Sequence, residues 1–129
     1  MMGHRFVVQE HTTPEGVHWD FMIERGDVLA TFRLEQPTEA VLDHAVRVVR
    51  IFDHPLKFLT YEGPVQKGTG KVRLVDRGTC HGSDEKEGLI TLDLRGEILQ
   101  GHFTLTRVDG PHWELRSREQ DISRFGERT

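Results

Sequence analysis

The sequence predicts an all-β protein, a small closed or nearly closed antiparallel β-barrel of about eight strands with little helix. Short runs rich in β-branched and aromatic residues recur along the chain, and glycine or proline separates them. Runs such as "ITLDL" and "HFTLTRV" alternate apolar with polar residues, as half-buried antiparallel strands do. Many strands with short connections favour a barrel, and an open sandwich is the alternative.

The first half of the chain contains four predicted strands. "TTPEG" and "RGD" are expected turns between the first three, and a short helical turn is expected before the fourth, with Pro37 near its start and Thr38 as its cap. The segment 53–64 is expected to be irregular because Pro55 and Pro64 interrupt it. The expected strands cover residues 5–11, 17–24, 28–34 and 46–51.

The second half is more regular, and its turns contain the pairs Arg95-Gly96 and Asp109-Gly110. We expect one barrel domain over residues 1–118 and a polar C-terminal tail over residues 119–129, because 129 residues suffice for one modest core. The expected strands cover residues 70–78, 88–96, 98–108 and 112–118.

Charge and cysteine content narrow the classes of function. The net charge of −4 argues against a protein that coats nucleic acid non-specifically. The segment 44–80 nevertheless contains seven basic and three acidic residues, so it could bind one phosphate or a nucleic-acid end. Cys80 is the only cysteine, which excludes a disulfide framework and a multi-cysteine zinc site. With neither a signal peptide nor an apolar span in the sequence, a cytoplasmic location is expected.

Histidines near the first predicted turn form a candidate metal site. On the strand 17–24, His18 and Asp20 share one face with Met22, and the opposite face is uniformly large and apolar. If the first two strands pair across "TTPEG", His11 lies beside His18. Two imidazoles and one carboxylate suit Mn²⁺, Fe²⁺ or Zn²⁺ and leave coordination positions open. Polar residues on an exposed hairpin face are the alternative.

"FVVQEH", followed by "VHWDFMIE", resembles the opening motif of the 3′-phosphoesterase domain of bacterial DNA ligase D. The similarity continues in the family's order through "DHPLKF", "YEGPV", "KVRLVDRGT" and the final "HWELR", so it covers nearly the whole chain.

The resemblance implies an eight-stranded β-barrel with a Mn²⁺-dependent active site, or one with another divalent metal such as Zn²⁺. It also implies removal of 3′-terminal ribonucleotides and 3′-phosphates from DNA ends in repair. The implied metal ligands are His11, His18 and Asp20, and the implied catalytic contact to the scissile phosphate is His54.

Several positions depart from the family's pattern, among them Met22 and Phe58. Met22 occupies the place of a catalytic arginine, and Phe58 occupies the place of a tyrosine. The glycine-rich stretch after "EGPV" is also shortened, to "QKGTG". Because a thioether offers a phosphate neither charge nor hydrogen bonds, we expect another arginine, Arg47 or Arg50, to bind the phosphate.

The sequence therefore supports two main hypotheses. The first is a metal-dependent 3′-phosphoesterase that acts on DNA or RNA-tipped DNA 3′ ends, beside separate ligase or polymerase proteins of end joining. The second is a catalytically impaired metal-binding barrel that recognises a phosphate or a nucleic-acid end without hydrolysing it. A structural barrel unrelated to nucleic acid is a third alternative.

Overall fold

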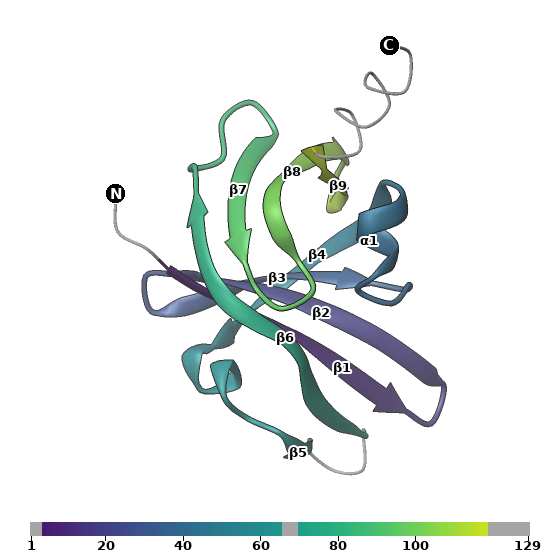
Figure 1. Ribbon diagram of the computed structural model, residues 1–129. Coiled ribbons are helices and arrows are strands. Elements are labelled where there is room, and N and C mark those ends of the chain that lie inside the picture. Colours follow the sequence, from purple (N-terminus) through teal and green to yellow (C-terminus); the bar gives the residue numbers. More distant parts are fainter. Residues whose placement is uncertain (1–3, 66–69, 119–129) are drawn as a thin grey trace.

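Eight antiparallel strands close into a barrel, which confirms the predicted fold class (Figure 1). The structure, a computed structural model, describes residues 4–65 and 70–118; the expected tail over residues 119–129 and most of "QKGTG" lie outside these ranges. The barrel strands are β1 (His4–Thr13), β2 (Gly16–Arg25), β3 (Val28–Leu34), β4 (Val46–Pro55), β6 (Lys71–Gly82), β7 (Leu89–Arg95), β8 (Gln100–Asp109) and β9 (His112–Ser117). A two-residue strand, β5 (Gly63–Pro64), pairs with the start of β6.

The helical content is small, as predicted. Helix α1 (Ala40–Asp43) lies beside β9, and the 3₁₀ helix η1 (Leu56–Leu59) follows β4 (Figure 1). The N-cap of α1 is Glu39 and not the expected Thr38, whose buried hydroxyl has no hydrogen-bond partner among the described residues. No helix in these ranges is long and apolar enough to cross a membrane.

Residues 53–64 are more ordered than the sequence predicts. β4 continues to Pro55, opposite Val28, and η1 follows at once. Proline is tolerated at this point because it is the last residue of the strand, so its missing N–H does not remove a hydrogen bond from the middle of the β-ladder.

Closure of the barrel depends on β1, which pairs with β2 along one edge and with β6 along the other. The β1–β6 register shifts between Val8 and Gln9, so that Val75 is an extra residue on β6. Such a bulge bends a strand and increases its twist, as a closed barrel requires.

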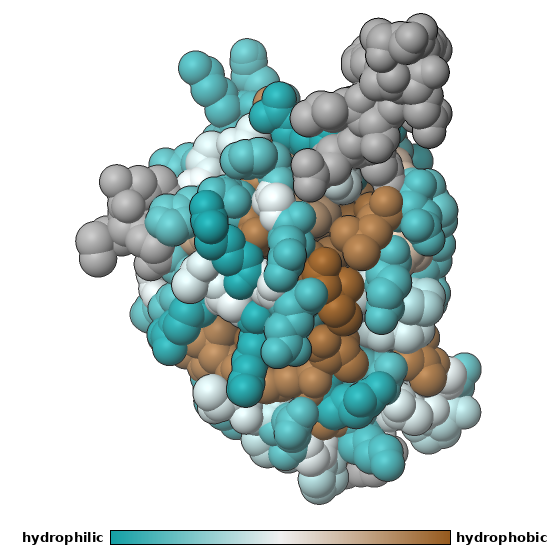
Figure 2. Space-filling model, in the orientation of Figure 1, coloured by the Kyte–Doolittle hydropathy of each residue, from teal (hydrophilic) through white to brown (hydrophobic). Residues whose placement is uncertain are grey.

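Two apolar clusters lie on opposite sides of the strands β1 to β3. The larger one fills the barrel and includes Phe6, Phe21 and Phe32, all fully buried. A smaller one lies on the outer face, where η1 packs against the barrel; it consists of Val7, Met22, Leu29 and Leu59, with Leu56, Phe58 and Leu74 at its margin. These strands are therefore buried on both faces. Figure 2 shows that, on the face of the molecule seen there, hydrophobic surface gathers near the centre within a hydrophilic surround.

The buried carboxylate of Asp76 joins β6 to the turn between β7 and β8. It accepts hydrogen bonds from the backbone N–H groups of Arg77, Glu97, Ile98 and Leu99, at 2.7–3.2 Å. The turn approaches so closely that a Cβ on Gly96 would lie 2.6 Å from Oδ1 of Asp76. Glycine is therefore required there, and the carboxylate satisfies backbone donors that lie beside the core.

We expect Asp76→Ala to lower the free energy of unfolding by about 3 kcal/mol, because it leaves several backbone donors without an acceptor. Chemical denaturation measures this change. Asp93→Ala is a matched control, since the Asp93 carboxylate makes an ion pair of 3.7 Å with the largely exposed Arg95 and should cost below about 1 kcal/mol. Equal effects of the two substitutions would contradict the role of Asp76.

Candidate metal centre and its pocket

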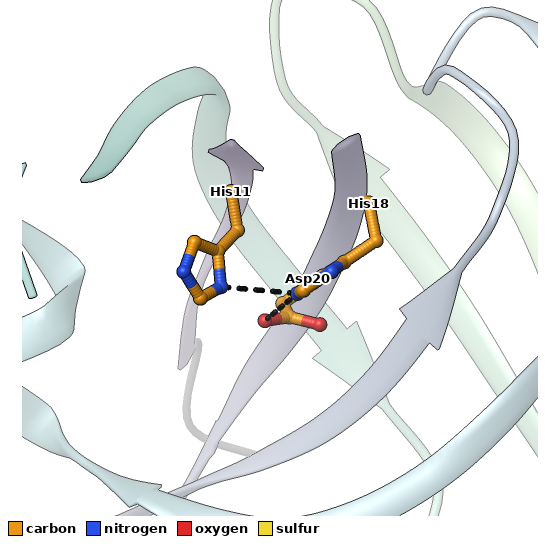
Figure 3. A group of neighbouring side chains, drawn as sticks. All are labelled: His11, His18 and Asp20. Atoms are coloured by element: carbon orange, nitrogen blue, oxygen red, sulfur yellow. Dashed lines mark hydrogen bonds and ion pairs between the residues drawn. The ribbon is translucent and has the colours of Figure 1, made fainter. Parts of the chain in front are cut away.

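The register of β1 and β2 places His11 directly opposite His18, as the sequence predicts. Nδ1 of His11 lies 3.1 Å from Nε2 of His18, and the same Nε2 lies 3.6 Å from Oδ2 of Asp20. Figure 3 shows the three side chains converging from the two neighbouring strands. One candidate ligand atom from each residue lies within 4.8 Å of the others.

This donor set fits a divalent transition metal. Two atoms that each bind one ion at about 2.1 Å lie roughly 3–3.5 Å apart, which is close to the spacings found here. Imidazole nitrogens with one carboxylate oxygen suit manganese, iron or zinc, and three protein ligands leave positions for water or substrate. The cluster could therefore hold a metal ion of this class.

The carboxylate of Asp20 is kept ionised although it is buried. Burial is the largest single influence and raises its pKa, but hydrogen bonds from His18 and Arg33, together with their charges, outweigh burial and hold the pKa of Asp20 below its ordinary value. Nε of Arg33 donates to Oδ1 of Asp20 at 3.0 Å, and a second nitrogen of the guanidinium lies 3.4 Å from Oδ2. The carboxylate of Asp20 is thus ionised and can bind a cation.

A pocket of about 730 Å³ opens beside this cluster on the outer wall of the barrel. His11, Asp20 and Arg33 line it from the strands. Its other wall is the chain from the end of β4 through η1 to β5, residues 52–65, here called the cover segment. The cover segment contributes Phe52, His54, Pro55, Lys57, Phe58, Tyr61, Pro64 and Val65.

Gln9 fixes the cover segment to the barrel. Its side chain is buried on the outer face of β1, two residues before His11. Its Nε2 donates hydrogen bonds to the backbone carbonyls of Phe58 and Tyr61, at 3.3 and 3.2 Å. The strand that carries a candidate metal ligand therefore also sets the position of the opposite pocket wall.

His54 lies in the pocket wall with one ring nitrogen engaged by the protein. Nδ1 is 3.0 Å from the backbone carbonyl of Phe52 and 3.0 Å from the hydroxyl of Thr31. Because Thr31 donates its own hydrogen to the carbonyl of Leu29, both neighbours of Nδ1 act as acceptors. We therefore assign the hydrogen of neutral His54 to Nδ1, which leaves Nε2 to interact with a ligand.

A bulge in β4 explains why His54 reaches the pocket. Thr31 pairs with Ile51 and Leu29 pairs with His54, so Phe52 and Asp53 lie where β3 has only Ala30. The extra residue reverses the alternation of faces. His54 thereby joins the outer face, although regular alternation would place it on the face of Arg50.

Neither arginine expected from the sequence lines the pocket. Arg50 lies on the other face, with its guanidinium carbon 5.4 Å from the centroid of the Phe32 ring and an ion pair of 3.9 Å to Asp53. Arg47 is exposed and pairs in register with Glu114 of β9. The guanidinium in the pocket belongs to Arg33.

Two residues that depart from the family's pattern are apolar packing residues here. Met22 is fully buried in the smaller cluster under η1. Phe58 packs at the margin of that cluster and meets His54 edge to face, with ring centroids 5.6 Å apart. At both positions the chain thus has an apolar side chain in the packing between the barrel and the cover segment.

Sequence reasoning missed Arg33, Gln9 and Phe52. Alternation in the predicted strand 28–34 contained a signal for Arg33, because the apolar Phe32 and Leu34 flank it and must face the core. Gln9 shares the parity of His11 in the same way. Phe52 sits at the bulge, which periodicity does not reveal.

The fold and site define a β-barrel protein with a His-His-Asp cluster beside a pocket on its outer wall. Residues 9–107 match the family model described as the DNA Ligase D 3′-phosphoesterase domain, and the chain belongs to this family.

Curated relatives agree with this assignment. The chain is 32% identical over 120 residues to the multifunctional non-homologous end joining protein LigD of Mycobacterium bovis, with 86% of the chain and 15% of the relative covered. It is 33% identical over 115 residues to the protein of the same name from Pseudomonas aeruginosa, with 81% and 13% covered. The protein of this name from Mycolicibacterium smegmatis is 28% identical over 131 residues, with 91% and 17% covered. The chain therefore spans between 13 and 17% of the length of these three relatives.

We expect His18→Ala to weaken the binding of Mn²⁺ or Zn²⁺ by more than about 100-fold, because losing even an outer partner of a metal ligand typically costs 10- to 100-fold. Isothermal titration calorimetry on the metal-free protein measures this. His102→Ala, a change at an exposed histidine of β8, should leave the affinity unchanged. Equal affinities of the wild type and His18→Ala would contradict the assigned ligands.

Position 22 is expected to accept an arginine only at a cost in stability. Because Met22 is fully buried among apolar side chains, we expect Met22→Arg to lower the free energy of unfolding by about 3 kcal/mol. Met22→Leu preserves volume and should cost less than about 1.5 kcal/mol. Chemical denaturation separates the two, and a Met22→Arg protein as stable as the wild type would contradict the packing role.

Proposed function

We propose that this chain is a metal-dependent 3′-phosphoesterase that trims 3′-terminal ribonucleotides or 3′-phosphates from DNA ends in repair. The observation that carries the proposal is that the His-His-Asp cluster lies beside one pocket, which Arg33 and His54 also line. Membership of the 3′-phosphoesterase family supports the reaction class, and the names of the relatives support a place in non-homologous end joining.

His11, His18 and Asp20 would hold the metal, for which Mn²⁺ is our first candidate and Zn²⁺ the second. A bound metal of this class supplies Lewis-acid stabilisation of charge on phosphoryl oxygens. Protonated histidines cannot bind it, so activity should fall at acidic pH and on addition of EDTA.

Two further side chains would act on the phosphate directly. His54 donates a hydrogen bond from Nε2 when its ring is protonated, because Nδ1 is already directed at Thr31 and Phe52. Arg33 reaches the pocket while it holds Asp20, and its remaining N–H groups can neutralise a phosphate oxygen. We propose that Arg33, rather than Arg47 or Arg50, supplies the positive charge that Met22 cannot.

The buried Met22 and the apolar Phe58 favour a second candidate function, a barrel that binds a metal and a 3′ end without hydrolysing it. In both cases the partner is a DNA or RNA-tipped DNA 3′ end, presented beside separate ligase or polymerase proteins of end joining.

The test is turnover of a primer–template that carries a 3′-phosphate or a 3′-terminal ribonucleotide, with Mn²⁺ present. We expect trimming by the wild type, none by His18→Ala, and a loss of about 10²-fold in kcat/KM for Arg33→Gln, comparable to the loss of one stabilising donor.

Arg47→Gln is the matched control and should retain wild-type turnover, since Arg47 lies outside the pocket. Trimming that survives EDTA would contradict the metal mechanism. Stoichiometric metal binding without trimming would favour the second candidate function.

A further inference from the structure

Phe52 is the most exposed large hydrophobic residue in the described part of the chain. Its exposed fraction is 73%, whereas the next, Val108, reaches 49%. A single exposed apolar side chain is ordinary on a protein surface and needs no explanation by itself. Phe52 differs because its ring lines the pocket that Asp20 and Arg33 also line.

The Phe52 ring is held in a defined orientation. It stacks on the imidazole of His54, with ring centroids 4.7 Å apart and an angle of 7° between the planes. His54 is in turn fixed by the hydroxyl of Thr31, which is fully buried. With one face of the ring on His54 and most of the residue exposed, the other face is presented to solvent.

Charge around this ring suits a nucleic-acid strand. Arg33 and the exposed Lys57 line the same pocket, and Lys57 Nζ lies 5.4 Å from the centroid of the Phe58 ring. Recognition of a nucleic-acid single strand combines two components: cations that follow the phosphate backbone and an aromatic face on which a base stacks. The aromatic face accepts any nucleobase, so such a contact is tolerant of sequence.

We propose that Phe52 is a stacking platform for the nucleobase of the 3′-terminal nucleotide, whose phosphate lies at the His-His-Asp cluster. The inference rests on the proposed function in that the pocket receives a nucleic-acid 3′ end. It defines the substrate class more narrowly: the site binds a terminal nucleotide that has its base more tightly than a small phosphomonoester that has no base.

The experiment measures binding apart from catalysis. Fluorescence anisotropy with Mn²⁺ present gives the Kd for oligonucleotides that end in a nonhydrolysable 3′-phosphonate. Three are compared: one with all bases, one abasic at the terminal nucleotide, and one abasic at the penultimate nucleotide. Phe52→Ala should weaken binding of the complete oligonucleotide between about 5-fold and 100-fold.

The controls isolate stacking from other effects. Phe52→Ala should leave the Kd of the terminally abasic oligonucleotide unchanged, and should weaken the penultimately abasic one as much as the complete one. Phe52→Trp should bind the complete oligonucleotide at least as tightly as the wild type, because indole offers a larger face. Circular dichroism and metal titration verify that both variants keep the fold and the metal site.

Three outcomes would overturn the inference: equal losses with and without the terminal base, a loss that depends on the penultimate base instead, or no binding of any oligonucleotide by the wild type. The proposed function is judged separately, by turnover of the corresponding 3′-phosphate. Base-dependent binding without turnover would support the stacking platform and contradict the proposed esterase activity. Turnover that Phe52→Ala leaves unchanged, together with binding that does not depend on the terminal base, would support the esterase activity and contradict the stacking platform.

Discussion

The pairing of β1 with β6 is the interaction on which the rest of the structure depends, because it turns a row of hairpins into a closed barrel. Once β1 is bonded along both edges, the directions of its side chains are fixed. Its outer face then presents three different functions in sequence: Val7 packs under η1, Gln9 holds the cover segment, and His11 belongs to the candidate metal cluster. Closure of the fold and assembly of the site therefore use the same strand.

The sequence predicted the parts of the structure that depend on local pairing. His11, His18 and Asp20 lie on one hairpin, so alternation and the turn between them suffice to bring them together. The same reasoning identified most strands, because each bears its own period-two pattern.

Contacts between distant segments were harder to predict. His54 was identified only through the resemblance to the ligase family, since its distance from His11 in the chain gives no local signal. Arg47 and Arg50 were expected near it because they lie on the strand that runs into His54. The bulge at Phe52 and Asp53 instead puts His54 on the opposite face from Arg50. The N-cap of α1 was also predicted wrongly. The Thr38 side chain is buried and makes no capping hydrogen bond to the helix, and Glu39 is the N-cap.

The outer layer of the barrel combines apolar packing with a cation from β3. Met22 and Phe58 belong to the packing that holds the cover segment, while Arg33 of β3 brings a guanidinium to Asp20. Met22 and Phe58 belong to the smaller cluster on the outer face, and Arg33 lines the pocket there, whereas the large cluster fills the inside of the barrel. Electrostatic stabilisation of a bound anion depends on where a positive charge lies in the pocket, and the charge can come from any strand that reaches this position.

The bulge in β4 has a consequence for how this chain tolerates insertions and deletions. Loss of either Phe52 or Asp53 would leave one residue opposite Ala30 and so restore regular pairing with β3, with Ile51 still opposite Thr31 and His54 still opposite Leu29. A one-residue deletion there thus keeps His54 on the outer face, but the single residue left opposite Ala30 faces the inside of the barrel, so the stack of Phe52 on His54 is lost. The extra residue in β4 is therefore what places the Phe52 ring in the pocket wall beside His54.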